Sequence, residues 1–188
     1  MQETKKIGFV AYWRSAASQV KQVRTLAGAG LLAALGTALK FLIIPLSQVL
    51  RINFAFLSTA LAGYMYGPIV AGLVAAVADI LGFLVGPPTG PYSPAFTVVA
   101  FVGGFLYGCW LYKKPVRLWR SFCAHATYIG VVSFLLNPLL LKWMYGNAYT
   151  GLVLARIPLN AVMLPLGTLL IYLLQKVVER QPGLLPNA

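Results

Sequence analysis

One carboxylate in this 188-residue chain, Asp79, is placed where it could do chemistry, and it is one of only three acidic residues. It lies near the end of an apolar stretch, residues 67–85, in which no other residue is charged. A helix of this length is roughly 28 Å long, enough to cross the apolar core of a bilayer. A carboxylate is costly in lipid, so Asp79 is expected to face a bundle interior or a wet cavity. There it could pair with an arginine or bind the polar edge of a ligand. Pairing or structural hydrogen bonding is the favoured interpretation.

A stiff loop follows this stretch directly. Residues 86–94, GPPTGPYSP, contain four prolines and two glycines, which excludes a helix. The loop and the residues after it bring Tyr92, Phe96, Thr89 and Ser93 over the end of the apolar stretch. Aromatic and hydroxyl groups are therefore expected beside Asp79.

Two arginines lie next to amides and irregular helices. Arg51 precedes Asn53, which begins an apolar stretch at 53–66. A helix over that stretch would be roughly 21 Å long, too short to span the core, so its first residues should line a pocket. Arg156 precedes Asn160 in a helix interrupted by prolines. The planar guanidinium suits two-point binding of a carboxylate, so both arginines are expected to bind an anionic group.

Amides and aromatic residues complete the predicted pocket. A flat heteroaromatic ring could stack on at least two of the aromatic side chains, while amides bind its polar edge. The sequence predicts a site for such a ring carrying an anionic arm. The candidate binding residues are Arg51, Asn53, Asp79, Tyr92, Phe96, Asn137, Trp143, Tyr145 and Arg156.

The motifs of several other functions are missing. No G-x-x-x-x-G-K-[ST] motif is present, so nucleotide hydrolysis by this chain is not expected. His125 is expected at a different membrane depth from Ser93 and Asp79, which argues against a Ser-His-Asp assembly. Cys109 and Cys123 are expected to be inert packing thiols, and no cluster of His, Cys and acids predicts a metal site. The chain is expected to bind a ligand without catalysis, cofactor or metal.

Composition places these residues in a membrane. The chain is 60% hydrophobic and 10% charged, with a mean hydropathy of +0.80. The formal net charge is +12, and the basic residues that produce it lie between apolar runs. This pattern fits membrane topology and not nucleic-acid binding. Residues 1–24 are basic and aromatic, and no signal peptide is expected in them. They are expected to lie on the cytoplasmic membrane surface as an amphipathic segment. The membrane domain is expected over 25–180 and a flexible tail over 181–188.

The apolar runs predict an all-α integral membrane protein with six transmembrane helices and both ends in the cytoplasm. Cytoplasmic segments would then hold eleven of the fifteen Lys and Arg residues, in agreement with the positive-inside rule. Of the four outer cations, Lys40 and Lys142 are expected to reach lipid phosphates. A break is expected at Asn137–Pro138, followed by a loop at 141–151. The helices are expected at 25–44, 53–66, 67–85, 94–112, 118–141 and 153–178.

Small residues repeat on the first predicted helix. The pairs are Ala29/Ala33 and Ala34/Ala38, each with four-residue spacing. Such pairs allow close helix approach, either within a bundle or at a docking face for another subunit. Six helices without an internal repeat are few for a self-sufficient transporter, so the chain is expected to bind a ligand and obtain energy from partners.

Four segments carry a family resemblance: VRTLAGAGLLAALGTALKF, the long stretch from RINFAF to FLYG, NPLLLKWMYG and RIPLNAVMLP. They cover nearly all six predicted helices and resemble the substrate-binding S component of energy-coupling factor (ECF) vitamin transporters, most closely the folate-type branch. The resemblance implies a multi-pass protein of a prokaryotic cell membrane that captures folate from outside. It also implies assembly with a transmembrane coupling subunit and two cytosolic ATPases, whose ATP cycle topples the bundle to release folate inward.

The resemblance also assigns residues to roles. Small residues of the first helix, Ala29/Ala33 or Ala34/Ala38, correspond to the contact with the coupling subunit. An S component for another vitamin or precursor, such as a pantothenate-like anion, and a non-transport membrane scaffold remain alternatives. A cation such as thiamine is disfavoured because the outer face has four cations and almost no acids. The residues that match ligand-binding motifs are Arg51, Asn53, Tyr92, Phe96, Asn137, Trp143 and Arg156.

Overall fold

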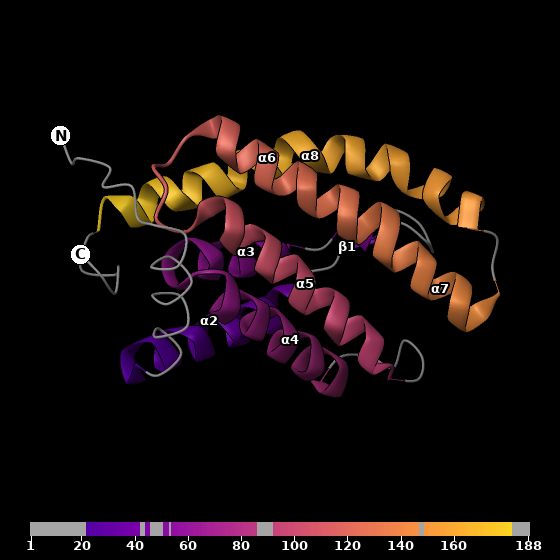
Figure 1. The fold of residues 1–188 in the computed structure, drawn as a ribbon, viewed down its shortest axis with the longest axis horizontal. Helices are drawn as coiled ribbons and strands as arrows, with labels where there is room; N and C mark the ends of the chain where they lie inside the picture. Colours follow the sequence, from indigo (N-terminus) through magenta and orange to yellow (C-terminus); the bar gives the residue numbers. More distant parts are fainter. Residues whose placement is uncertain are drawn as a thin grey trace.

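The computed structural model describes residues 22–41, 44–45, 51–52, 54–85, 92–146 and 149–181, which form a bundle of helices (Figure 1). Two-residue strands, β1 (Ile44–Pro45) and β2 (Arg51–Ile52), pair antiparallel where a plain loop was expected. The predicted amphipathic segment and tail lie almost wholly outside the described residues. The helices are α2 (Val23–Phe41), α3 (Ala55–Tyr66), α4 (Pro68–Val85), α5 (Pro94–Leu111), α6 (Leu118–Tyr128), the π-helix η1 (Ile129–Leu136), α7 (Asn137–Tyr145) and α8 (Tyr149–Glu179).

A tight turn at Gly67 joins α3 to α4. Gly67 has φ +94°, in the left-handed region that favours glycine, and a Cβ there would lie 3.3 Å from the ring of Tyr112. Pro68 then begins α4, where its missing N–H costs nothing and its fixed φ suits the first turn. The turn therefore sits beside the carboxyl end of α5. The predicted bounds of α3 and α4 differ from the observed ones by at most two residues.

The predicted break at Asn137–Pro138 is wrong, because α6, η1 and α7 form one continuous helix from Leu118 to Tyr145. Proline lacks an N–H and its ring clashes with the carbonyl four residues back in an α-helix. Here the preceding turns widen into a π-helix, and the Asn137 N–H donates to the Val132 carbonyl five residues back. The helix therefore continues through Pro138 without a break. Trp143, predicted in a loop, lies on α7.

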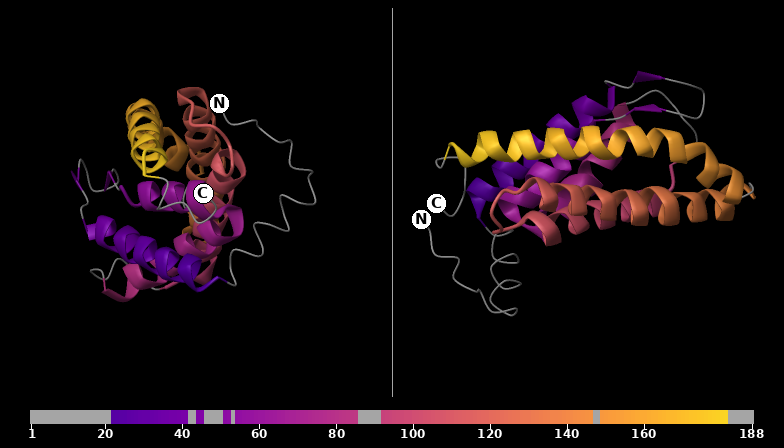
Figure 2. Two further views of the ribbon diagram at one scale, coloured as in Figure 1. Left: turned by 90° about the vertical axis from the view of Figure 1, so that its left-hand side faces the viewer. Right: turned by 90° about the horizontal axis from the view of Figure 1, so that it is seen from above.

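The last helix, α8, is longer than predicted. It has 31 residues, begins at Tyr149, and contains both Pro158 and Pro165 in its interior. Figure 2 shows α8 running back along α6, η1 and α7 after the chain reverses between α7 and α8. The end of α8 and the connection between α5 and α6 lie at the same end of the bundle, and the α7–α8 reversal lies at the opposite end (Figure 1).

Among the described residues, four helices are long and apolar enough to cross a membrane. The short helix α3 has 12 residues, about 18 Å at the usual rise, in agreement with the prediction that this segment cannot span the core. The four candidate spans are Pro68–Val85, Pro94–Leu111, Leu118–Trp143 and Arg156–Glu179.

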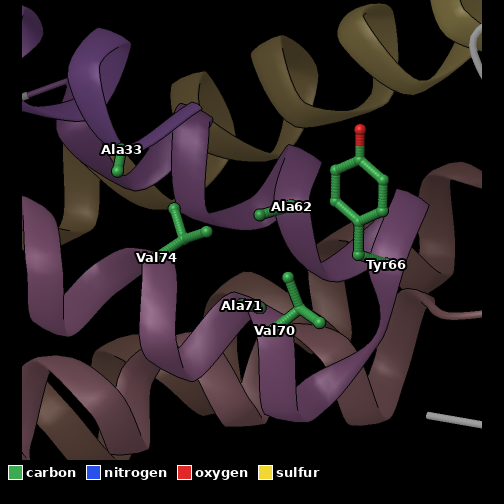
Figure 3. Close-up of a cluster of buried hydrophobic side chains, with 6 residues drawn as sticks. All are labelled: Ala33, Ala62, Tyr66, Val70, Ala71 and Val74. Carbon is green, nitrogen blue, oxygen red and sulfur yellow. The ribbon is translucent and has the colours of Figure 1, made fainter. Parts of the chain in front are cut away.

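Small residues bring the amino-terminal helices together. A buried cluster joins α2, α3 and α4 (Figure 3). On the other side of α4, added Cβ atoms at Gly104 and Gly108 would meet the backbones of Ala71 and Pro68. Lipid offers no hydrophobic drive for helix association, so such close backbone packing holds the bundle together. The cluster consists of Ala33, Ala62, Tyr66, Val70, Ala71 and Val74.

Candidate functional site

A cavity of about 510 Å³ lies inside the bundle, and every described helix contributes to its lining. Small-molecule sites typically occupy roughly 300–1,000 Å³, so this cavity can hold an organic ligand. The first turns of α3 supply Ala55, Phe56 and Thr59. A helix too short to span the membrane therefore begins at the depth of the cavity, which agrees with the reasoning from its length.

Asp79 binds a lysine on one wall of this cavity. Its Oδ1 accepts a hydrogen bond of 2.8 Å from Lys40 Nζ, and its Oδ2 accepts one of 3.1 Å from Thr97 Oγ1. Because Thr97 donates to the carboxylate, the Tyr92 hydroxyl donates the 2.8 Å bond that joins these two residues. The expected partner was an arginine, and Lys40 was expected to reach lipid; both expectations are corrected by this ion pair.

Another part of the lining is polar and includes Arg156. Arg156 and Asn160 lie one turn apart on α8 and both line the cavity. Asn160 Nδ2 donates a 2.9 Å hydrogen bond to Ser133 Oγ on η1, which fixes the amide. Among the described residues no ion pair joins Arg156 to an acidic side chain, and Asp79 pairs with Lys40. A partly buried guanidinium without a carboxylate partner among the described residues favours an anionic ligand.

Aromatic rings form the floor of the cavity. Phe56, His125 and Tyr128 line it, with the ring centroids of Phe56 and His125 4.8 Å apart. His125 and Tyr128 are nearly parallel, 9° between planes with centroids 6.1 Å apart. A flat ring can stack on such a surface. These residues were missed because stacking was expected from loop aromatics; the three-residue spacing of His125 and Tyr128 on one helix was the available signal.

His125 is held at both ring nitrogens. Its Nε2 lies 3.2 Å from the Met163 carbonyl, which can only accept, so Nε2 carries the proton. Nδ1 then accepts the 2.7 Å hydrogen bond from the Tyr107 hydroxyl. The expected difference in membrane depth between His125 and Asp79 stays a prediction, although both residues line the cavity. Both ring nitrogens of His125 take part in hydrogen bonds, so the imidazole is not available to activate a nucleophile.

The structure brings four predicted binding residues together at the cavity: Asp79, Phe96, Asn137 and Arg156.

The other predicted binding residues lie elsewhere or outside the description. Tyr92 is 41% exposed and is joined to the site by its hydrogen bond with Thr97, and Trp143 is 81% exposed on α7. For Arg51 only the backbone is described, in β2 opposite Pro45, and for Tyr145 only the end of α7. Asn53 lies outside the described residues.

The two alanine pairs of α2 face different surroundings. Ala33 is 3% exposed in the cluster shared with α3 and α4, and Ala29 packs against that cluster. Ala34 and Ala38 are exposed. The first pair therefore packs within the chain, and the second is the pair left on the surface.

Residues 24–175 match the family described as "ECF transporter, substrate-specific component". This chain belongs to that family. Its fold also matches the "Crystal structure of FolT bound with folic acid", with a TM-score of 0.74 and 30% identity over 82% of this chain and 94% of the other. This family is one of substrate-binding transport subunits and not of enzymes. The four apolar helices among the described residues agree with a membrane protein.

Two curated relatives of this S component carry the same name. "Folate transporter FolT" of Clostridium novyi (strain NT) is 36% identical over 71% of this chain and 77% of the relative. "Folate transporter FolT" of Leuconostoc mesenteroides subsp. mesenteroides (strain ATCC 8293) is 27% identical over 68% of this chain and 72% of the relative. The ECF S-component fold is therefore common to this chain and to a protein solved with folic acid.

Proposed function

We propose that this chain is the folate-binding S component of an ECF-type importer in a prokaryotic cell membrane. It captures folate from outside and releases it inward when coupled to a transmembrane subunit and two cytosolic ATPases. The observation that carries the assignment of the ligand is Arg156, a cavity cation that no acid among the described residues neutralises. The similarity to folate transporters supports the same ligand.

The chemistry of folate fits the cavity from both ends. Its pterin is a flat heteroaromatic ring, which suits stacking on Phe56, His125 and Tyr128. Asn137 and Asn160 line the cavity and offer amide donors and acceptors for the ring edge. The glutamate end carries two carboxylates, and the Arg156 guanidinium is the cation assigned to it. Arg51 is retained as a second candidate for that end.

Six membrane crossings with both ends in the cytoplasm remain the proposed topology. α2 and α3 add to the four candidate spans, and α3 crosses only part of the core. The connection between α5 and α6 carries Lys113, Lys114 and Arg117, and Arg120 follows in the first turn of α6. This connection lies at the same end of the bundle as the last residues of α8 (Figure 1). Placing this end in the cytoplasm satisfies the positive-inside rule.

The exposed pair Ala34/Ala38 is the proposed contact with the coupling subunit. Small residues four apart on a lipid-facing helix surface allow close approach of another helix. Ala29/Ala33 is not available for this contact, because Ala33 is buried against α3 and α4.

Calorimetric titration of the purified, detergent-solubilised chain tests the ligand. Folate is expected to bind tightly with one-to-one stoichiometry, while thiamine and pantothenate give no heat of binding. Thiamine tests a cationic ligand and pantothenate tests the alternative of another vitamin-like anion. Binding of pantothenate in place of folate by folded protein would transfer the assignment to a different S component.

A further inference from the structure

The ion pair between Lys40 and Asp79 is part of the cavity wall, not of the outer surface. Both residues line the cavity, and their side chains are 25% and 24% exposed. Among the described residues, the cavity has three formally charged side chains: these two and Arg156. The pair therefore decides whether a ligand meets the negative charge of Asp79.

The helix that carries Asp79 also holds the lysine in place. Gly82 lies one turn after Asp79 on α4, and a Cβ there would be 2.6 Å from Lys40 Cδ. The stem of Lys40 thus runs across the bare backbone at Gly82 to reach the carboxylate. On the other oxygen, Thr97 donates to Asp79 and is itself bound by Tyr92. The ion pair is preformed by contacts from α2, α4 and α5.

We propose that Lys40 sets the charge selectivity of the cavity by neutralising Asp79, so that an anionic ligand meets a net positive wall. This inference rests on the proposed function and adds a specificity-determining residue to it. With the pair intact, the charges of Lys40, Asp79 and Arg156 leave one net positive charge. Without Lys40 they cancel, and an exposed carboxylate repels the anionic arm of folate.

This role differs from direct binding of the ligand by Lys40. If Lys40 acts only through Asp79, removing both charges restores the net charge of the cavity and should restore binding. If Lys40 itself held a carboxylate of folate, removing Asp79 as well would not replace the lost contact. The double variant separates the two roles.

Folate titrations of four variants test the inference. Lys40→Met is expected to weaken folate binding roughly ten-fold, which is about 1.4 kcal/mol. Lys40→Met combined with Asp79→Asn should bind within about three-fold of wild type, since the repelling charge is gone. Asp79→Asn alone should bind at least as tightly as wild type. Lys142→Met removes the same charge from α7 outside the cavity lining and serves as the matched control, with affinity unchanged.

Several results would overturn this inference while leaving the proposed function intact. They are wild-type affinity in Lys40→Met, a double variant as weak as Lys40→Met, and weakened binding in Asp79→Asn. Thermal unfolding of each unliganded variant shows whether it is folded, and Asp79→Asn decides the matter should Lys40→Met fail to fold. Absence of folate binding by folded wild-type protein would instead overturn the proposed function and this inference with it.

Discussion

The hydroxyl of Tyr107 donates a 2.7 Å hydrogen bond to Nδ1 of His125 beneath the aromatic floor of the cavity. Both side chains are buried, at 0% and 2% exposed. The other ring nitrogen of His125 reaches the Met163 carbonyl, so one imidazole joins α5, α6 and α8. The floor on which a ligand ring would stack is therefore fixed by hydrogen bonds from three helices.

Replacement of Tyr107 by phenylalanine should destabilise the protein. The change leaves Nδ1 of His125 buried without its donor, which costs about 1–3 kcal/mol in unfolding free energy. Reversible unfolding in mixed detergent micelles measures the loss. Tyr172→Phe is the control. The ring of Tyr172 lies 5.7 Å from Lys176 Nζ, and its hydroxyl has no hydrogen bond to another described residue. Equal stability of Tyr107→Phe and wild type would show that the bond contributes nothing.

Replacement of Gly108 by alanine should separate α4 from α5. The added methyl group would meet the backbone of Pro68, which cannot move aside as a flexible side chain could. A loss of about 1–3 kcal/mol in unfolding free energy is expected, the usual cost of overpacking. Gly130→Ala is the matched control, because a Cβ at Gly130 has no atom within 4 Å. Comparable stability of the two variants would contradict close packing at this crossing.

Leucine at Ala34 or Ala38 should block assembly with the coupling subunit without changing folate affinity. Both alanines are exposed on α2, so the larger side chain disturbs only what docks there. Co-purification with the coupling and ATPase subunits, together with a folate titration, measures the two effects separately. Ala161→Leu places the same bulk on an exposed position of α8 and should assemble normally. Full assembly by Ala34→Leu and Ala38→Leu would remove this face from the proposed contact.

Much of the architecture could be predicted from the sequence because membrane helices are bounded by sharp changes of composition. Pro68 and Pro94 begin α4 and α5 within a residue of the predicted starts, since proline suits the first turn. The shortness of α3 indicated that its first residues line a pocket, and Ala55 and Phe56 at its start line the cavity, whereas Phe54 just before it does not. The rarity of charge in apolar stretches likewise singled out Asp79 and Arg156, and both line that cavity.

The other features of the fold and the site depend on contacts between side chains that composition does not predict. The three-residue spacing of His125 and Tyr128 places both on one helix face. In lipid, however, both the outer and inner faces of a helix are apolar, so the hydrophobic pattern does not indicate that this face points into the cavity. The partner of Asp79 depends on the path of the Lys40 stem over Gly82. The proline at Pro138 was read as a break, whereas a π-helix absorbs it and keeps Asn137 on the cavity wall.

The assignment of folate to this cavity is tested most directly by titrating folate into Arg156→Gln beside wild type. Loss of a charged hydrogen-bonding partner should cost about 1.5–3 kcal/mol, on the order of 10- to 100-fold in affinity. Lys142→Gln, which removes a cation from α7 outside the cavity lining, should bind as wild type does. Tight folate binding by wild type with a selective loss in Arg156→Gln would support the account. Equal folate affinity in wild type and folded Arg156→Gln would contradict it.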